Sequence, residues 1–166
     1  MTLTVARLRE VLDYDPNSGE FRWRIAVSRR VHIGGCAGSL REDGRVRIHV
    51  DGRTYRRSRL AWLWMTGEWP KGLVDHKDRD CGNDKWGNLR EASCADNARN
   101  VKNCGNKTGK RGVKLVTTTG KFTAQIRAGK APHHLGTFET AEAAAAAYDH
   151  AARTHHGEFA VTNGDL

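Results

Sequence analysis

The sequence of 166 residues predicts an α+β fold. Short segments alternate apolar and polar residues, as half-buried strands do, while others place apolar residues at helical spacing. Clusters of Gly, Pro, Asn and Asp separate these segments and indicate turns. All five tryptophans lie at or before Trp86, so the composition changes along the chain. We therefore predict three parts, over residues 1–70, 71–104 and 105–166.

The first 25 residues predict a helix followed by a strand. Thr4 is a suitable N-cap, and apolar residues at helical spacing follow it up to Leu12. Residues 15–19 read Asp-Pro-Asn-Ser-Gly, a turn that ends this helix. Residues 21–25 alternate and predict a short strand, and the Gly-rich segment 29–38 predicts a loop.

Residues 45–56 predict a β-hairpin. The segment 45–50 alternates strictly, and Asp51-Gly52 is a strong signal for a two-residue turn. Such a turn pairs Val50 with Arg53, His49 with Thr54, Ile48 with Tyr55 and Arg47 with Arg56. One face of the hairpin is then apolar and faces the core.

The other face of this hairpin predicts a contact with DNA. It carries Arg45, Arg47, His49 and Arg56 and no acidic residue, and like charges on neighbouring strands repel unless an anion covers them. Residues 1–70 contain thirteen arginines and no lysine. Arginine binds phosphate and guanine edges in a bidentate manner, and a two-stranded ribbon fits the major groove. A solvated polar face remains the alternative.

A second helix is expected after the hairpin. Ser58 is the predicted N-cap, and Gly67 ends the helix. Trp62, Trp64 and Trp69 are interpreted as core residues, with stacking on bases as the alternative.

The charge of the chain favours an anionic partner. Twenty-eight Lys and Arg against nineteen Asp and Glu give a net charge of +9, which indicates nucleic acid before membrane. No apolar run approaches the roughly 20 residues of a spanning helix, and no signal peptide opens the chain. We expect a soluble protein of the cytoplasm.

The four cysteines do not predict a metal site or a disulfide scaffold. Cys36, Cys81, Cys94 and Cys104 lie 45, 13 and 10 residues apart, whereas zinc sites show closely paired cysteines. We interpret them as reduced small apolar residues.

The segment 73–102 carries the candidate catalytic residues. A short strand ends in Asp75-His76, and Asn88 follows a polar loop. Ser93 and Asp96 form a capping box that places Asn97 in the first turn of a helix. An acid, an imidazole and two carboxamides suit one divalent metal ion and one general base for phosphodiester hydrolysis. Taken alone, His76 is better explained as a hydrogen-bonded turn histidine.

Together, the four residues and their spacing resemble the HNH nuclease family, in the branch whose third signature residue is Asn. The resemblance implies a ββα-metal core with His76 as general base and Asp75 and Asn97 as metal ligands. Asn88 would fix the imidazole by hydrogen bonding. Because Asn97 replaces the histidine of many members, the ligands are hard oxygens, which favours Mg²⁺ or Mn²⁺ over Zn²⁺.

Residues 105–166 predict three short strands, at 113–116, 121–127 and 132–136, after a linker at 103–109. Thr140 then caps an Ala-rich helix that extends to about His155. The motifs Gly112-Val113, Gln125-Ile126-Arg127, Leu135-Gly136-Thr137-Phe138 and Ala145-Ala146-Ala147-Tyr148-Asp149 resemble the Apetala/ethylene-response DNA-binding domain. That resemblance implies a three-stranded antiparallel sheet packed on one helix, with Lys114, Lys121, Gln125 and Arg127 facing DNA. Phe122 stands where that family commonly has Trp.

These observations predict a metal-dependent, sequence-tolerant DNA endonuclease of the homing type found in phages and mobile elements. We expect a monomer that nicks one strand of double-stranded DNA, because one catalytic set and no apolar stripe for dimerisation are present. The alternative is a non-catalytic DNA-binding regulator that keeps the nuclease core as a scaffold. A zinc-stapled module is excluded by the cysteine spacing.

Overall fold

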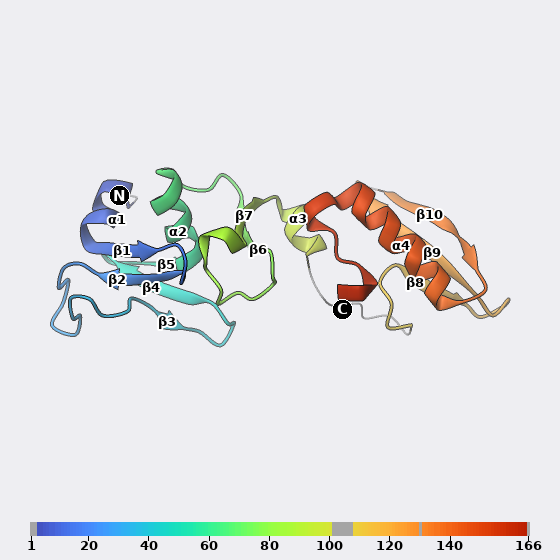
Figure 1. The fold of residues 1–166 in the computed structure, drawn as a ribbon, viewed down its shortest axis with the longest axis horizontal. Coiled ribbons are helices and arrows are strands. Elements are labelled where there is room, and N and C mark those ends of the chain that lie inside the picture. Colours follow the sequence, from blue (N-terminus) through green and yellow to red (C-terminus); the bar gives the residue numbers. More distant parts are fainter. Residues whose placement is uncertain (1–2, 101–107, 130, 166) are drawn as a thin grey trace. The chain divides into compact units, whose positions relative to one another are not determined.

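The computed structural model describes residues 3–100, 108–129 and 131–165. The chain forms two compact units, Met1–Cys94 and Ala95–Leu166, each of which combines helices and strands (Figure 1). The mixed α and β content is as predicted. The division into three functional parts stays a prediction, because the first unit spans residues from the first two of them.

The first unit opens with helix α1 (Val5–Val11), followed at once by strand β1 (Leu12–Asp15) and strand β2 (Glu20–Trp23). Thr4 caps the helix as predicted, since its hydroxyl accepts a hydrogen bond from the backbone N–H of Arg7 at 3.2 Å. The assignment of Leu12 to the helix was wrong. Residues 12–15 alternate between buried and exposed and pair with β2, so strand pairing overrides their helical spacing.

Strands β3 (Ser39–Leu40), β4 (Val46–Val50) and β5 (Arg53–Arg56) form an antiparallel sheet in the order β3-β4-β5. All four predicted pairs of the β4–β5 hairpin are present, from Val50 with Arg53 to Arg47 with Arg56. Asp51 and Gly52 both have positive φ angles, of 47° and 78°, as this turn requires.

Helix α2 (Arg57–Thr66) begins two residues earlier than predicted. Arg56 occupies the N-cap position, and Ser58 is buried in the first turn instead of capping the helix. Gly67 ends the helix in the left-handed conformation, with φ at 81°, as expected.

One apolar core connects these elements. It includes Leu8, Phe21, Ile48, Leu60 and Leu89, and it therefore joins the N-terminal elements to the central segment. Trp64 and Trp69 pack against this core, and Trp62 contacts Trp86 with ring centroids 5.3 Å apart. Trp64 and Trp69 thus pack on the core, as interpreted from the sequence, whereas Trp62 is half-buried beside Trp86.

The central segment forms strand β6 (Leu73–His76), the short 3₁₀ helix η1 (Trp86–Asn88) and strand β7 (Leu89–Ala92), and β6 and β7 are antiparallel. Helix α3 (Cys94–Arg99) follows directly. The order of strand, loop, strand and helix is the predicted one. Because α3 crosses the boundary between the two units, its packing on β6 and β7 in a ββα-metal arrangement stays a prediction.

The second unit contains strands β8 (Val113–Val116), β9 (Lys121–Ala128) and β10 (Ala131–Phe138), antiparallel in the order β10-β9-β8. Helix α4 (Ala141–His156) packs on one face of this sheet (Figure 1). The small side chains of its buried alanines allow close contact with Val113, Ala124 and Ile126. Short helices η2 (Gly157–Phe159) and η3 (Asn163–Asp165) complete the unit.

Three expectations concern features outside these elements. Most of the predicted linker, residues 103–107, and Cys104 lie outside the described residues. Cys36, Cys81 and Cys94 are free thiols, and Cys36 and Cys94 are exposed. Among the described helices, none combines the length and apolar composition needed to cross a bilayer.

Candidate functional site

The β6–β7 pair positions the two central candidates, Asp75 and His76. In its register Asp75 lies opposite Arg90, and His76 lies opposite Leu89. Neighbouring residues on a strand point to opposite faces, so the two side chains contact different partners. Each residue is only 6% exposed, which makes those partners energetically important.

Asp75 is held by Arg90. Both Nε and Nη2 of Arg90 lie 2.9 Å from the same carboxylate oxygen, Oδ2. Arg90 is itself buried, so this is an ion pair within the protein and not a surface contact. A buried carboxylate without a partner would be costly, and the ion pair with Arg90 fixes the Asp75 carboxylate in position.

His76 is held by an acid that the sequence analysis did not identify. The Nε2 atom of His76 lies 2.7 Å from Oδ1 of Asp84, and the second oxygen, Oδ2, accepts a hydrogen bond from Nε of Arg57 at 2.6 Å. Asp84 is 1% exposed. A carboxylate in the polar loop 77–85 gave no special signal, because its partners come from α2 and β6, elsewhere in the sequence.

The loop that carries Asp84 is fixed against the β1–β2 hairpin. The hydroxyl of Tyr14 donates to the backbone carbonyl of Asp84 at 2.7 Å. Burial raises the pKa of the Tyr14 phenol, and the negative charge of Asp84 raises it further. Gly19, with φ at 78°, passes so close that a Cβ atom there would lie 2.5 Å from the carbonyl carbon of Asp84. No larger residue fits this approach without movement of the backbone.

Asn88 does not bind the imidazole, contrary to the prediction. Its Oδ1 atom accepts from the backbone N–H of Asp78 at 3.1 Å, and its Nδ2 atom donates to Asp78 Oδ1 at 2.9 Å and to the Asn83 carbonyl at 2.7 Å. The hydrogen bond expected from Asn88 is made by Asp84 instead. Asn88 therefore organises the loop that follows His76.

Asp78 is the centre of this loop. Burial acts to raise the pKa of its carboxyl, but hydrogen bonds from Asn83, Asn88 and Asp80 outweigh burial, and the pKa is lowered. The ionised form of Asp78 thus holds the turn that leads from β6 toward Asp84.

The donor set suits a hard divalent cation. Asp75 supplies a carboxylate fixed at the end of a strand, and Asn97, on α3, would supply a carboxamide. The described residues contain no cluster of three His, Cys, Asp or Glu side chains that could enclose a metal ion. Mg²⁺ commonly binds through one or two protein oxygens and completes its sphere with water and substrate phosphate, so the residues fit such an ion. The approach of Asn97 to Asp75 stays a prediction.

The outer face of the β4–β5 hairpin carries the predicted arginines, but it also has an acid. Asp43, in the turn before β4, pairs with Nη1 of Arg45 at 3.5 Å and with Nη2 of Arg47 at 3.1 Å. A hydrogen bond from the Arg45 backbone N–H lowers the pKa of Asp43, and Arg47 lowers it further. The expectation of a face without acids was wrong, because a turn residue outside the alternating segment reaches it.

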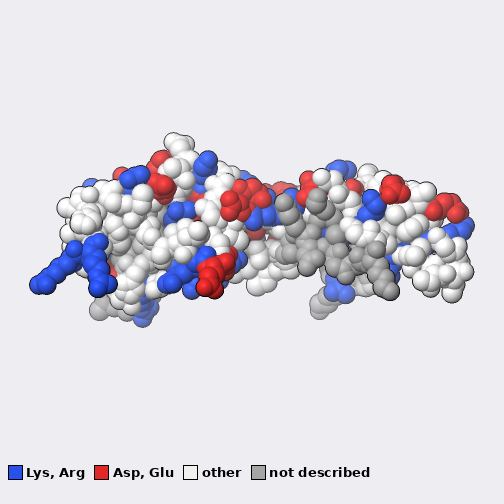
Figure 2. Space-filling model, turned by 90° about the horizontal axis from the view of Figure 1, so that it is seen from below, with Lys and Arg blue, Asp and Glu red and all other residues white. Residues whose placement is uncertain are grey.

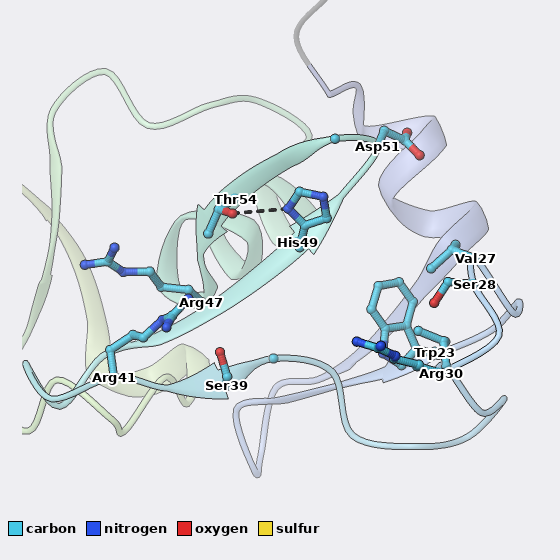
Figure 3. Close-up of a pocket in the computed structure, with 13 residues that line it drawn as sticks. Trp23, Val27, Ser28, Arg30, Ser39, Arg41, Arg47, His49, Asp51 and Thr54 are labelled. Carbon is cyan, nitrogen blue, oxygen red and sulfur yellow. Dashed lines mark hydrogen bonds between the residues drawn. The ribbon is translucent and has the colours of Figure 1, made fainter.

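A hollow of about 690 Å³ opens on this side of the first unit. Figure 3 shows Arg47, His49 and Thr54 on the hairpin, with Arg41 beside Arg47 and with Trp23 and Arg30 across the hollow. Within the described part of the chain, Arg30 and Arg41 have no ion-pair partner. Sequence reasoning missed these two arginines because they lie in loops without a strand pattern.

The exposed face of the second unit's sheet carries Lys114, Gln125 and Arg127, as expected from the alternation. Lys121 lies on the same face, but its Nζ atom forms an ion pair with Glu139 at 2.6 Å. Figure 2 shows that basic side chains are spread over both units, with acidic ones beside several of them. On the face that Figure 2 shows, the basic side chains therefore do not form a single patch.

Comparisons with known proteins match separate parts of the chain. Over 46 residues it is 54% identical to the ethylene-responsive transcription factor LEP of Arabidopsis thaliana, which covers 26% of this chain and 22% of that protein. A solved structure of DNA binding and cleavage by the HNH homing endonuclease I-HmuI is 25% identical, with a TM-score of 0.42. That likeness covers 54% of this chain and 51% of the other.

The sequence model of the HNH endonuclease family matches residues 55–99. The match spans the end of the hairpin, α2, both strands of the central pair and α3. It contains all four residues predicted from the spacing, as well as Asp84 and Arg57. Residues 55–99 of this chain are therefore similar in sequence to the HNH endonuclease family.

Proposed function

We propose that this protein is a metal-dependent DNA endonuclease that hydrolyses a phosphodiester bond. The observation that carries the proposal is made at the end of β6. There a buried acid and a buried imidazole are adjacent in sequence, face different partners and lie inside the segment that matches the HNH endonuclease family.

Each residue has a role that follows from its chemistry. His76 accepts a proton from the attacking water, since an imidazole exchanges protons near neutral pH. Asp75 and Asn97 would hold one divalent ion, Mg²⁺ or Mn²⁺. When bound, such an ion stabilises the negative charge that develops on the phosphate. Arg90 holds Asp75 so that its carboxylate is in place before DNA binds.

Two surfaces of different composition would contact the DNA. In the first unit the hollow combines Arg30, Arg41 and Arg47 with hydroxyl groups and His49. The second unit offers Lys114, Gln125 and Arg127 from a sheet. Because these surfaces are unlike each other, we propose that the protein binds an extended asymmetric site as a monomer and nicks one strand.

The likeness to a transcription factor supports a second candidate. A DNA-binding regulator would use the same sheet of the second unit without cutting DNA. The two candidates differ at Asp75, because only the endonuclease needs its carboxylate for the reaction.

Metal-dependent cleavage of plasmid DNA tests the proposal. The wild-type protein should convert supercoiled plasmid or phage DNA to cut forms in Mg²⁺ or Mn²⁺ and leave it intact in EDTA or in Zn²⁺ alone. Asp75→Ala should remove cleavage at every Mn²⁺ concentration, whereas Glu20→Gln, which breaks an exposed ion pair with Arg22, should retain it. DNA binding without any cleavage by the wild-type protein would favour the regulator, and full activity in EDTA would refute the metal.

A further inference from the structure

Asp84 lies between a histidine and an arginine in the interior of the first unit. Its two carboxylate oxygens are divided between them, with Oδ1 at 2.7 Å from His76 Nε2 and Oδ2 at 2.6 Å from Arg57 Nε. Arg57 continues through Nη2 to the carbonyl of Gly82, also at 2.6 Å. This row of groups leads directly to the imidazole that the proposed reaction uses.

We propose that Asp84 and Arg57 are positioning residues that keep His76 in the tautomer with its proton on Nε2. The inference rests on the proposed function, because it states which ring nitrogen of the proposed general base, His76, accepts the proton from water. It adds two residues to the four that the family pattern supplies.

The tautomer follows from the charge on Asp84. An ionised carboxylate can only accept hydrogen bonds, so the ring nitrogen that faces it must carry the proton. In neutral imidazole the other nitrogen, Nδ1, then has the lone pair. The guanidinium of Arg57 lies 2.6 Å from the other oxygen of Asp84 and offsets the negative charge of this buried carboxylate.

The position of Asp84 is also fixed through its backbone. Tyr14 donates to its carbonyl, and the backbone N–H of Trp86 donates to the carbonyl of Pro16 at 3.0 Å. Together with the close approach of Gly19, these contacts attach the loop to the β1–β2 hairpin at Asp84 and at the two residues that follow it. The carboxylate cannot follow a rotating imidazole, so it defines the orientation of the ring.

The proton balance of the reaction is simple in this arrangement. Nδ1 takes one proton from water, and the resulting hydroxide oxygen forms the new bond to phosphorus. The bond to the leaving oxygen breaks, and its electron pair stays on that oxygen, which then takes a proton from solvent. The ring becomes an imidazolium with protons on both nitrogens. The proton on Nε2 stays on the ring, and Asp84 stabilises the positive charge without accepting a proton.

The substitution Asp84→Asn reverses the hydrogen bond with little change in shape. Arg57 still requires an acceptor, so the carboxamide oxygen faces Arg57 and the NH₂ group faces His76. The NH₂ group donates to Nε2, which moves the ring proton to Nδ1 and removes the lone pair that accepts from water. We expect kcat to fall by about 10²- to 10⁴-fold, while DNA affinity changes by less than about threefold.

Nitrogen NMR of the His76 ring tests the tautomer directly, in the full-length protein at a pH where the ring is neutral. Wild type should show the proton on Nε2, and Asp84→Asn should show it on Nδ1. Glu20→Gln is the control, since it also removes an acid that pairs with an arginine, but at an exposed position. It should leave both the tautomer and kcat unchanged.

A wild-type ring protonated on Nδ1 would overturn the inference, and this measurement needs no variant. A folded Asp84→Asn protein with wild-type kcat would overturn it as well. If wild type cuts no DNA in Mg²⁺, the proposed function fails, whereas the tautomer still decides whether Asp84 and Arg57 orient the ring.

Discussion

Arg90 contacts Asp75 through two nitrogens that share one carboxylate oxygen, at 2.9 Å each. Because both residues are buried, the pair is more sensitive to loss of one partner than a surface ion pair is. Arg90→Ala removes one partner of this buried ion pair and should lower the free energy of unfolding by about 3–5 kcal/mol.

Urea denaturation of Arg90→Ala, Asp75→Ala and the double variant measures this coupling. The double variant should be more stable than Arg90→Ala alone, since neither charge of this pair remains. Arg22→Ala, at an exposed pair with Glu20, is the control and should cost less than about 1 kcal/mol. Equal costs for Arg22→Ala and Arg90→Ala would show that Arg90 does not hold Asp75.

The hydrogen bonds of Asn88 predict that it acts through the loop and not on the imidazole. Asn88→Ala should lower the free energy of unfolding by about 1–3 kcal/mol, since it leaves groups around Asp78 without partners. Both Asn88→Ala and Asn83→Ala, which removes the 2.6 Å hydrogen bond to Asp78 in the same loop, should therefore reduce cleavage. If Asn88 instead acts directly on His76, Asn83→Ala should cut at the wild-type rate.

The arginines on the outer face of the β4–β5 hairpin predict that DNA affinity depends on salt concentration. Each arginine that contacts phosphate contributes about 0.9 to the slope of log K against log salt. Changing Arg45, Arg47 and Arg56 together to Ala should therefore flatten the slope by about two to three units.

Asp43 provides the opposite change on the same face. Its lowered pKa keeps it ionised at neutral pH, where it competes with DNA for Arg45 and Arg47. Asp43→Asn should bind DNA more tightly at low salt. Titrations with labelled duplex at several salt concentrations measure both effects, with Arg22→Ala as the control. An unchanged slope in the triple arginine variant would show that this face is solvated and does not contact DNA.

The elements that sequence alone predicted well are those determined by local chemistry. Asp51-Gly52 fixes the turn of the hairpin, and a two-residue turn leaves a single register, so all four pairs could be written in advance. Thr4 and Thr140 cap their helices through a hydroxyl that acts within three residues.

The features that escaped prediction depend on contacts between distant segments. Asp84 meets Arg57 and His76 only after the loop folds back on α2 and on the β1–β2 turn. Leu12 fits a helix by spacing, and only its pairing with Trp23 makes it part of a strand. Local patterns therefore indicated the candidate site, while the side chains that contact His76 and Asp84 could be identified only from the tertiary structure.

The proposed monomer with a single catalytic set predicts nicking. One His76 with one Asp75 attacks one phosphate, and a double-strand break needs a second site or a second binding event. A supercoiled plasmid with one target should be converted first to the relaxed circle, with little linear product at early times. Light scattering should give a monomer mass near 18.5 kDa. Linear DNA as the first product, together with a dimer mass, would contradict the proposal.

Cleavage and binding measured on the same His76→Ala protein test the central claim most directly. His76 is assigned to proton transfer, while binding is assigned to basic surfaces on both units, so the two activities should separate. We predict that His76→Ala loses detectable cleavage in Mg²⁺ and Mn²⁺ and binds DNA within about threefold of wild type, since one group in proton transfer contributes mainly to the rate. Cleavage by His76→Ala at the wild-type rate, or a parallel loss of binding and cleavage in a folded protein, would contradict this account.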